Sequence, residues 1–189
     1  MFDIKKALYT GILIGIGNIP YMCSENSLCG LVPFFLAFLA AIRLNLDLYI
    51  SKIGSYKKYD FKFLTKTLLA NLVGSIFICM IFLVIQPEIA KEFDIPLILK
   101  YNVFDLQPLS LFIRSLLCGV CMHIMSLKKN VIITFFCIIA FAIFGFRHCI
   151  AEFPFLVLNF SLSNLLKFIS VFGGNSIGAM LMGFLASEE

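Results

Sequence analysis

Six apolar segments of about 20 residues each run through almost the whole chain and constrain its fold more than any other feature. They lie at residues 7–24, 27–50, 67–86, 108–127, 131–152 and 163–186. A helix of this length crosses the ~30 Å hydrocarbon core of a bilayer. Charged residues make up only 14% of the chain, whereas roughly a quarter is usual in soluble domains. The sequence therefore predicts an all-α membrane protein with six transmembrane helices, in a single domain over residues 1–189.

Lysines are unevenly distributed among the connections, and this pattern predicts the orientation. The 51–66 connection carries five lysines and one acidic residue, and lysine pairs lie at 5–6 and 128–129. The 87–107 connection carries four acidic residues and two lysines. Because basic loops stay on the cytoplasmic side, we expect both termini in the cytoplasm and the protein in the cell (inner) membrane. The first segment has no small-x-small cleavage site, so we interpret it as a permanent helix.

A short motif occurs twice inside the apolar segments. Ala70-Asn71-Leu72-Val73-Gly74-Ser75 reappears 104 residues later as Gly174-Asn175-Ser176-Ile177-Gly178-Ala179. Each copy lies in the third segment of its half, if the halves are residues 1–104 and 105–189. With three spans per half, the second half enters the membrane in the opposite direction. The motif therefore predicts an inverted 3+3 repeat, typical of transporters whose site lies between the halves. Its fixed positions are Asn71, Gly74, Asn175 and Gly178.

Ionisable side chains inside an apolar segment are costly unless they are paired or sheltered. Arg43 and Asp47 are four residues apart, so one interpretation is a pair on one helical face. Arg114 and Lys167 lie near the predicted outer surface, where a long side chain reaches water. His123 lies near the predicted cytoplasmic end of its segment, and we expect it at the membrane interface.

The densest polar group in a segment is Arg147-His148-Cys149-Ile150-Ala151-Glu152, which follows Gly145. It brings a guanidinium, an imidazole and a carboxylate into about one and a half helical turns. One interpretation is structural: Arg147 and Glu152 neutralise each other, and His148 only packs between them. The other interpretation is functional, with the three side chains forming a site inside the membrane.

At this point the motifs resemble the formate/nitrite transporter family. Residues 145–152 are similar to its Gly-Phe-Glu-His-Ser-Ile-Ala-Asn signature, and residues 71–74 to its third-helix motif. Residues 174–178 resemble its last-helix Gly-Asn-Ile-Ile-Gly, residues 34–49 its second helix, and residues 111–118 its fourth. The resemblance implies a homopentamer with an aquaporin-like fold, in which the second and fifth helices are broken. It also implies passage of small monovalent anions of weak acids.

The resemblance also implies roles for single residues. His148 corresponds to the central histidine of the pore. Phe34, Phe38, Leu48 and Phe141 fall where the family narrows its pore to hydrophobic constrictions. A desolvated anion is costly there, whereas its neutral acid crosses readily. An imidazole suits proton exchange with a passing anion, because its unperturbed pKa is close to neutral.

Several positions depart from the family pattern. Arg147 stands where the family has Glu, and Glu152 where it has Asn. Ile50 replaces a Thr of the second helix, and Gly119 replaces an Asn of the fourth. These departures concern the polar lining of the pore, so they leave the substrate and transport competence open.

We therefore predict a channel or transporter for small weak-acid anions such as formate, nitrite or hydrosulfide, with Arg147, His148 and Glu152 as its anion and proton site. The alternative is a diverged protein of the same fold that is differently selective or does not transport. A membrane enzyme is not expected, because the segments carry no nucleophile–base–orienter set. Cys118-x-x-Cys121 has no second pair at metal-ligand spacing, so we expect no metal or cofactor. The expected partners are a small anion, the lipid bilayer and copies of the chain, with no nucleic acid.

Overall fold

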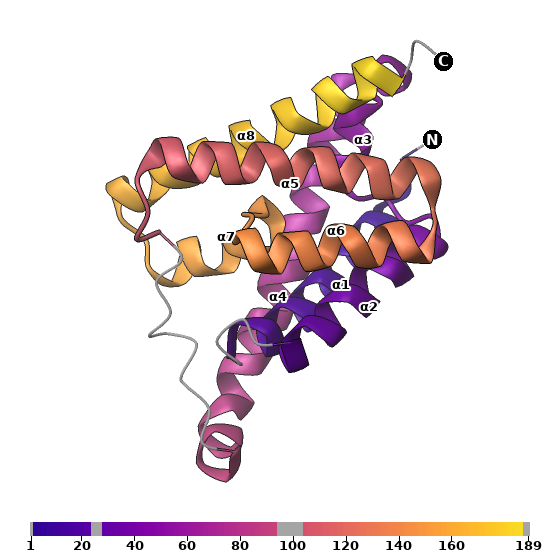
Figure 1. Ribbon diagram of the computed structural model, residues 1–189. Helices are drawn as coiled ribbons and strands as arrows, with labels where there is room; N and C mark the ends of the chain where they lie inside the picture. Colours follow the sequence, from indigo (N-terminus) through magenta and orange to yellow (C-terminus); the bar gives the residue numbers. More distant parts are fainter. Residues whose placement is uncertain (1, 24–27, 94–103, 187–189) are drawn as a thin grey trace.

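The computed structural model describes residues 2–23, 28–93 and 104–186, which form helices and the turns between them (Figure 1). The elements in order are α1 (Ile4–Cys23), α2 (Leu28–Arg43), α3 (Tyr49–Gly54), the 3₁₀ turn η1 (Tyr56–Lys58), α4 (Phe61–Phe93), α5 (Pro108–Lys128), α6 (Val131–Phe144), α7 (Cys149–Leu158) and α8 (Leu162–Ala186). Asp94 and Lys100 of the predicted acidic connection lie outside the described residues.

Four helical stretches are long and apolar enough to cross a bilayer. They are Phe61–Ile85, Pro108–Lys128, Val131–Leu158 and Leu162–Ala186, with a shorter apolar helix at Gly30–Arg43. These stretches agree with an all-α membrane protein. Length and hydropathy alone do not confirm the predicted count of six, because α1 is not among these stretches and the 27–50 segment is divided, with only its first part a substantial helix.

The second and fifth predicted segments are each interrupted. α2 ends at Arg43 and α3 begins at Tyr49, while α6 ends at Phe144 and α7 begins at Cys149. A residue with positive φ lies at each interruption, Asn45 at 51° and Gly145 at 59°. The left-handed conformation stops a helix, and Gly and Asn adopt it at low cost.

Some predicted boundaries are wrong. The third segment was predicted over 67–86, but α4 runs from Phe61 to Phe93. Asp60 explains the early start, because its carboxylate accepts a hydrogen bond of 2.6 Å from the Phe63 N–H and caps the helix. The fifth segment was predicted to end at 152, whereas α7 continues to Leu158 with its apolar run.

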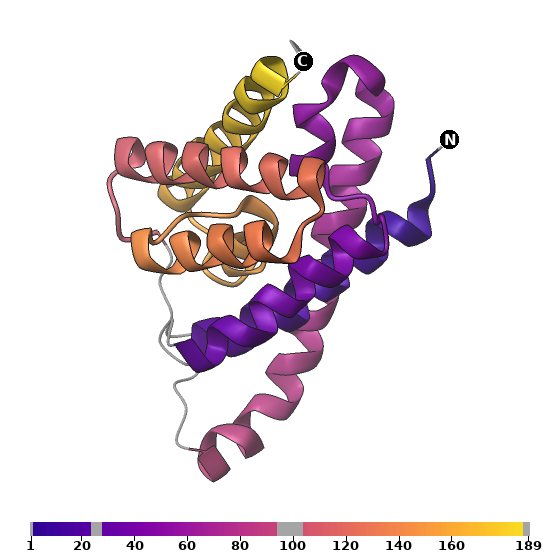
Figure 2. The same ribbon diagram turned by 45° about the vertical axis from the view of Figure 1, so that its right-hand side comes forward.

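The long helices pack in two groups. α1 lies against α4 and α2, and α5 lies along α8 (Figures 1 and 2). The short helices cross between the groups, since α3 packs on α5 and α8 while α7 packs on α4 and α1. Each half of the chain thus inserts a short helix into the other half, which makes the two halves one body. The start of α1, the end of α8 and all of α3 lie toward the same end of the molecule.

Candidate functional site

His148 lies at the interruption between α6 and α7, as the N-cap residue of α7. Its side chain is fully buried, and its Nδ1 accepts a 3.2 Å hydrogen bond from the backbone N–H of Ala151. Because Nδ1 is the acceptor, the proton of the neutral ring is on Nε2. Nε2 has no hydrogen-bond partner among the residues that the structure describes. The imidazole is therefore fixed on one side and offers an N–H on the other.

Arg114 of α5 stabilises this interruption from outside. Its Nη1 donates hydrogen bonds to the carbonyl oxygens of Phe144, at 3.0 Å, and Gly145, at 3.3 Å. The last carbonyls of a helix have no partner within it, so the guanidinium caps α6. The sequence placed Arg114 near the surface but did not reveal this role.

Aromatic rings pack against His148. The Phe38 ring meets the imidazole edge-on, with centroids 5.2 Å apart. Phe34 contacts Phe38 at 4.9 Å and Phe141 at 5.0 Å, and Tyr21 stacks on Phe34 at 5.2 Å. Phe34 and Phe38 are fully buried. Three of the residues that resemblance assigned to constrictions thus form one aromatic cluster, and Tyr21 is a member that sequence reasoning missed.

A cavity of about 60 Å³ lies beside His148. We call it the Arg147 cavity, and it is lined by Asn18, Tyr21, Met22, Phe141, Gly145, Phe146, Arg147, His148, Ala151 and Glu152. It has room for one or two water-sized molecules, since a water occupies roughly 30 Å³ in the liquid. The cavity brings the guanidinium, the imidazole and the carboxylate of the predicted site together.

Arg147 and Glu152 form an ion pair in this cavity, with Nη1 3.3 Å from Oε1. Their side chains are 19% and 6% exposed. Arg147 Nε and Glu152 Oε2 have no hydrogen-bond partner within the described part of the chain. The pair expected from the structural interpretation is present, yet each member keeps a polar atom for a ligand. Asn18 also contributes here, because its Nδ2 donates to the Ala151 carbonyl at 3.0 Å and holds α1 against α7.

Leu48 occupies the other interruption, where it is the N-cap residue of α3 and only 3% exposed. It lines a pocket of about 270 Å³, which we call the Leu48 pocket. The other lining residues are Ala41, Ile42, Asn45, Leu46, Ser51, Lys52, Ser55, Lys58, Tyr59, Ser126, Leu127 and Lys129. The lining is apolar at α2 and rich in lysine and hydroxyl groups elsewhere. Leu48 therefore closes the buried end of a polar opening.

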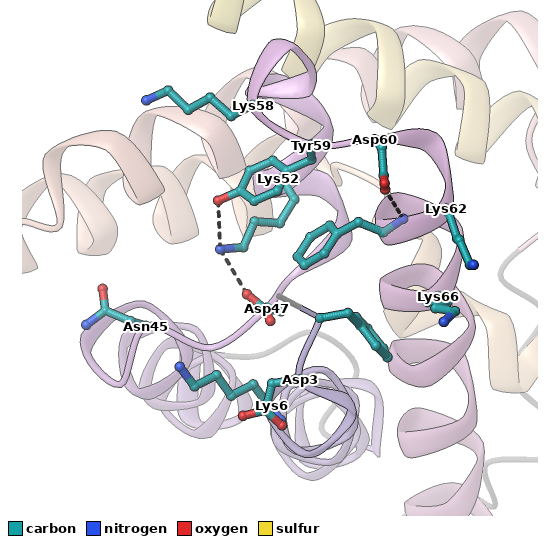
Figure 3. Close-up of a pocket in the computed structure, with 12 residues that line it drawn as sticks. Asp3, Lys6, Asn45, Asp47, Lys52, Lys58, Tyr59, Asp60, Lys62 and Lys66 are labelled. Atoms are coloured by element: carbon teal, nitrogen blue, oxygen red, sulfur yellow. Dashed lines mark hydrogen bonds and ion pairs between the residues drawn. The ribbon is translucent and has the colours of Figure 1, made fainter.

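The expected pair of Arg43 and Asp47 is wrong. α2 ends at Arg43, so the two residues do not share a helical face. Asp47 instead pairs with Lys52 of α3, with Nζ 2.9 Å from Oδ1. Lys52 also donates to the Tyr59 hydroxyl at 3.4 Å (Figure 3).

Asn175 of α8 clamps the interruption that carries His148. Its Nδ2 donates to the carbonyls of Ser115 and Arg147, each at 2.8 Å. Its Oδ1 accepts the N–H of Cys149, the first residue of α7, at 2.8 Å. The amide thus joins α5 to both sides of His148.

Asn71 of α4 makes the corresponding contacts at the other interruption. Its Nδ2 donates to the Ala7 carbonyl at 2.7 Å and to the Asp47 carbonyl at 2.9 Å. Its Oδ1 accepts the N–H of Tyr49, the first residue of α3, at 2.9 Å. The repeated asparagine therefore positions a short helix in each half, a role the sequence motif did not reveal.

The repeated glycines allow a close approach of backbones. A Cβ at Gly74 would overlap the carbonyl oxygen of Leu8, and a Cβ at Gly178 would overlap that of Leu116. Gly74 brings α4 onto α1, and Gly178 brings α8 onto α5. Only glycine leaves room for these contacts.

His123 is buried rather than exposed at the membrane interface, with 1% of its surface accessible. Its Nδ1 lies 3.2 Å from the Ser51 carbonyl, and Gly54 leaves room for the ring beneath α3. Lys167 donates to the Phe104 carbonyl at 2.6 Å. Among the described residues, no three His, Cys, Asp or Glu side chains are grouped so that they could hold a metal ion.

No protein-family model and no curated protein sequence matches the chain. Solved structures do match its fold. An FNT family ion channel superposes with a TM-score of 0.74 at 17% identity, over 98% of this chain and 88% of that one. A pentameric formate channel with formate bound has a TM-score of 0.64 at 16% identity, over 98% of this chain and 93% of that one. The resemblance drawn from the motifs is thus supported at the level of architecture, and the protein has the fold of an FNT family ion channel.

Proposed function

We propose that the protein is a channel for small monovalent anions of weak acids, such as formate, nitrite or hydrosulfide. The observation that carries this proposal is the buried imidazole of His148, which lines the Arg147 cavity and whose Nε2 has no partner in the described chain. Buried polar groups in proteins are nearly always hydrogen-bonded. A small polar ligand in the cavity would satisfy Nε2.

The aromatic cluster favours a neutral permeant. Phe34, Phe38 and Phe141 form an apolar barrier in which an ionised group loses its hydration. The cost is far smaller for the protonated acid, so the same surroundings that oppose the anion promote its protonation. Only anions whose acids form at accessible pH would pass, and strong-acid anions such as chloride would be rejected.

His148 acts in this proposal as a hydrogen-bond donor to the anion. If Nε2 gave up its proton permanently, the neutral ring would carry its proton on Nδ1 and lose the bond to the Ala151 N–H. The arrangement therefore favours donation of a hydrogen bond over release of the proton from the ring. The proton that neutralises the anion then comes from the aqueous phase, because Glu152 is the carboxylate partner of Arg147.

Arg147 would attract the anion to this cavity, and Glu152 would limit how tightly it is held. A lone buried guanidinium would bind an anion too strongly for rapid passage. The carboxylate 3.3 Å away offsets part of its charge. Lysines around the Leu48 pocket would attract anions at the opposite opening.

We also propose six spans in an inverted 3+3 repeat, with both termini cytoplasmic. The matched contacts of Asn71 and Asn175 support the repeat. The lysine-rich 51–66 connection supports the orientation. Labelling of Lys57→Cys in a cysteine-free background, from outside intact cells, would contradict this arrangement; labelling only after lysis is expected.

Pentameric assembly is a further part of the proposal. The formate channel that shares this fold is pentameric. His148 and its aromatic neighbours come from one chain, so assembly is not required to complete the site. Native mass spectrometry in mild detergent should show five copies, and monomers alone would count against the proposal.

Proteoliposomes provide the test of transport. The internal pH is followed after addition of formate, nitrite or hydrosulfide, with chloride as the control anion. We expect a faster pH change than in protein-free vesicles, and faster still when the external pH is lowered. The alternative, a diverged protein that does not transport, predicts the protein-free rate for all anions. The Arg147–Glu152 pair favours that alternative in one respect, because it partly neutralises the site.

A further inference from the structure

A pocket of about 500 Å³ lies where α1 and α4 begin and the chain enters α3 (Figure 3). Five lysines, three aspartates and three aromatic residues are among its lining, and we call it the lysine pocket. Its volume is within the roughly 300–1,000 Å³ of most small-molecule sites. Lys52 and Lys58 also line the Leu48 pocket of the proposed channel, whereas Lys6, Lys62 and Lys66 have no part in it.

The aspartates of the lysine pocket are already engaged. Asp3 accepts the backbone N–H of Lys5 at 3.0 Å, and Asp60 accepts that of Phe63 at 2.6 Å. Both carboxylates cap helices, where an acidic group is stabilising. Asp47 is paired with Lys52.

Four of the five lysines remain available. Lys6, Lys58, Lys62 and Lys66 form no ion pair with any residue that the structure describes, and all four are exposed. With five lysines and three aspartates, the pocket carries a formal charge of two positive units. The excess of lysines gives the pocket a positive potential, which would attract an anionic ligand.

Aromatic rings form one wall of the lysine pocket. The Phe63 ring stacks on Tyr59 with centroids 4.6 Å apart and meets Phe2 edge-on at 5.8 Å. Lys66 Nζ lies 5.7 Å from the centre of the Phe2 ring. The wall offers an apolar surface next to cations, which suits a ligand with a charged and an uncharged part.

We propose that the lysine pocket binds a phosphate-bearing ligand. A phosphate monoester carries nearly two negative charges at neutral pH and a phosphodiester headgroup carries one, so either is attracted by the net positive pocket. Lysine ammonium groups are common phosphate ligands. Two sources share this chemistry, namely a soluble phosphate compound and the headgroup of an anionic phospholipid. In both cases the phosphate meets the lysines and the remainder of the ligand lies on the aromatic wall.

Two binding measurements on the purified full chain in uncharged detergent test the proposal and separate the sources. Equilibrium dialysis measures binding of inorganic phosphate and of ATP. Native mass spectrometry measures retention of phosphatidylglycerol against phosphatidylcholine. The test variant is Lys6→Gln with Lys66→Gln, which removes one lysine from α1 and one from α4. The matched control is Lys57→Gln with Lys128→Gln, which removes the same charge outside the lysine pocket.

We expect the wild type to bind at least one of these ligands and the test variant to bind it roughly 25-fold more weakly, about fivefold for each lysine. The control variant should bind as the wild type does. Binding of phosphate or ATP identifies a soluble ligand, and selective retention of phosphatidylglycerol identifies a lipid. Absence of all binding by the wild type, or equal loss in both variants, would overturn the proposal and leave the lysines with orientation in the membrane as their role. These measurements involve no transport, so their outcome is independent of the proposed channel.

Discussion

The chain interrupts a helix twice, at residues 44–48 and 145–148, and the two places share one backbone arrangement. In each, an asparagine from a long helix accepts the first N–H of the following short helix. In each, an ion pair joins residues five positions apart, but the signs are reversed. Asp47 precedes Lys52 in the first, whereas Arg147 precedes Glu152 in the second. The asparagine contacts are therefore independent of the charge around them.

The two interruptions differ most in the N-cap residue of the short helix, which lies between the two members of each ion pair. Leu48 caps α3 without a side-chain hydrogen bond, while His148 caps α7 through Nδ1. The surroundings differ as well, since Lys52 lines pockets of about 500 and 270 Å³, and Arg147 lines a cavity of about 60 Å³. One interruption is thus a wide basic opening, and the other is a narrow site with an imidazole. The shared backbone geometry thus positions the two short helices, and the side chains within it determine the chemistry of each interruption.

The largest effect is expected from the shared asparagines. Asn175→Ala leaves two buried carbonyls and one buried N–H without their partner, and each loss costs about 1–3 kcal/mol. We expect a loss of about 4 kcal/mol in the free energy of unfolding, followed by circular dichroism in detergent. Asn71→Ala should lose a similar amount if the two clamps are equivalent. The control is Asn164→Ala, whose partly exposed side chain makes one bond to the Asn159 carbonyl and should cost about 1 kcal/mol. Wild-type stability in both Asn71→Ala and Asn175→Ala would show that these asparagines do not hold the interruptions together.

Removing the cation of each ion pair should lower the free energy of unfolding by a different amount. Arg147→Gln leaves the Glu152 carboxylate buried without its cation, and we expect a loss of about 3 kcal/mol. Adding Glu152→Gln should recover most of it, because the uncompensated charge is then gone. The Lys52 and Asp47 side chains are only slightly more exposed, at 22% and 10%, but both line a pocket of about 500 Å³, so Lys52→Gln should cost less, about 1 kcal/mol. The unfolding free energies of these variants provide the check, and equal losses from Arg147→Gln and Lys52→Gln would show that the surroundings of the pairs do not differ as described.

Substitutions of His148 and of Leu48 should have different effects on anion flux. A hydrogen bond to a charged group contributes about 1.5–3 kcal/mol, so His148→Ala should lower formate flux by roughly tenfold to a hundredfold. His148→Asn keeps an N–H donor and should retain more flux than His148→Ala. Leu48→Ala removes no donor, so its flux should not fall below that of the wild type. Initial rates in proteoliposomes, corrected for the amount of folded protein, measure all three. Unchanged flux in His148→Ala would remove the imidazole from the mechanism.

Helix boundaries could be predicted from the sequence where the apolar runs end sharply. α5 was predicted within a few residues because Pro108 and Lys128 bound its apolar run, and α8 because polar Asn159 and Ser161 precede its run. The interruption at Gly145 carries a glycine with positive φ, a signal visible in sequence. The interruption at Asn45 has no glycine and was expected only through the family resemblance. α4 was predicted too short, because Lys62 and Lys66 end the apolar run while the helix extends back to its cap at Asp60.

The site was predictable to a similar extent. His148, Arg147 and Glu152 were expected from their rarity within an apolar segment, and the structure groups them around one cavity. Their partners were missed, because Arg114 and Asn18 act on backbone carbonyls that are distant in sequence. Asp47 was assigned the wrong partner, since the four-residue spacing to Arg43 has meaning only within a continuous helix. Sequence thus identifies unusual side chains well, but not the interruptions that decide what they meet.

Ionic strength should affect the two ion pairs only slightly, but to different extents. Salt screens charges that water reaches, with a Debye length of about 10 Å at 0.1 M and about 3 Å at 1 M, and it screens buried pairs much less. The difference in unfolding free energy between wild type and Lys52→Gln should therefore shrink by a few tenths of a kcal/mol when salt rises over this range. The difference between wild type and the double variant Arg147→Gln, Glu152→Gln should not change, because that pair borders a cavity of only about 60 Å³. Because each difference is taken at the same salt concentration, general effects of salt on the detergent micelle cancel. If both differences shrink equally, water reaches both pairs, and the Arg147 cavity is an open vestibule like the Leu48 pocket.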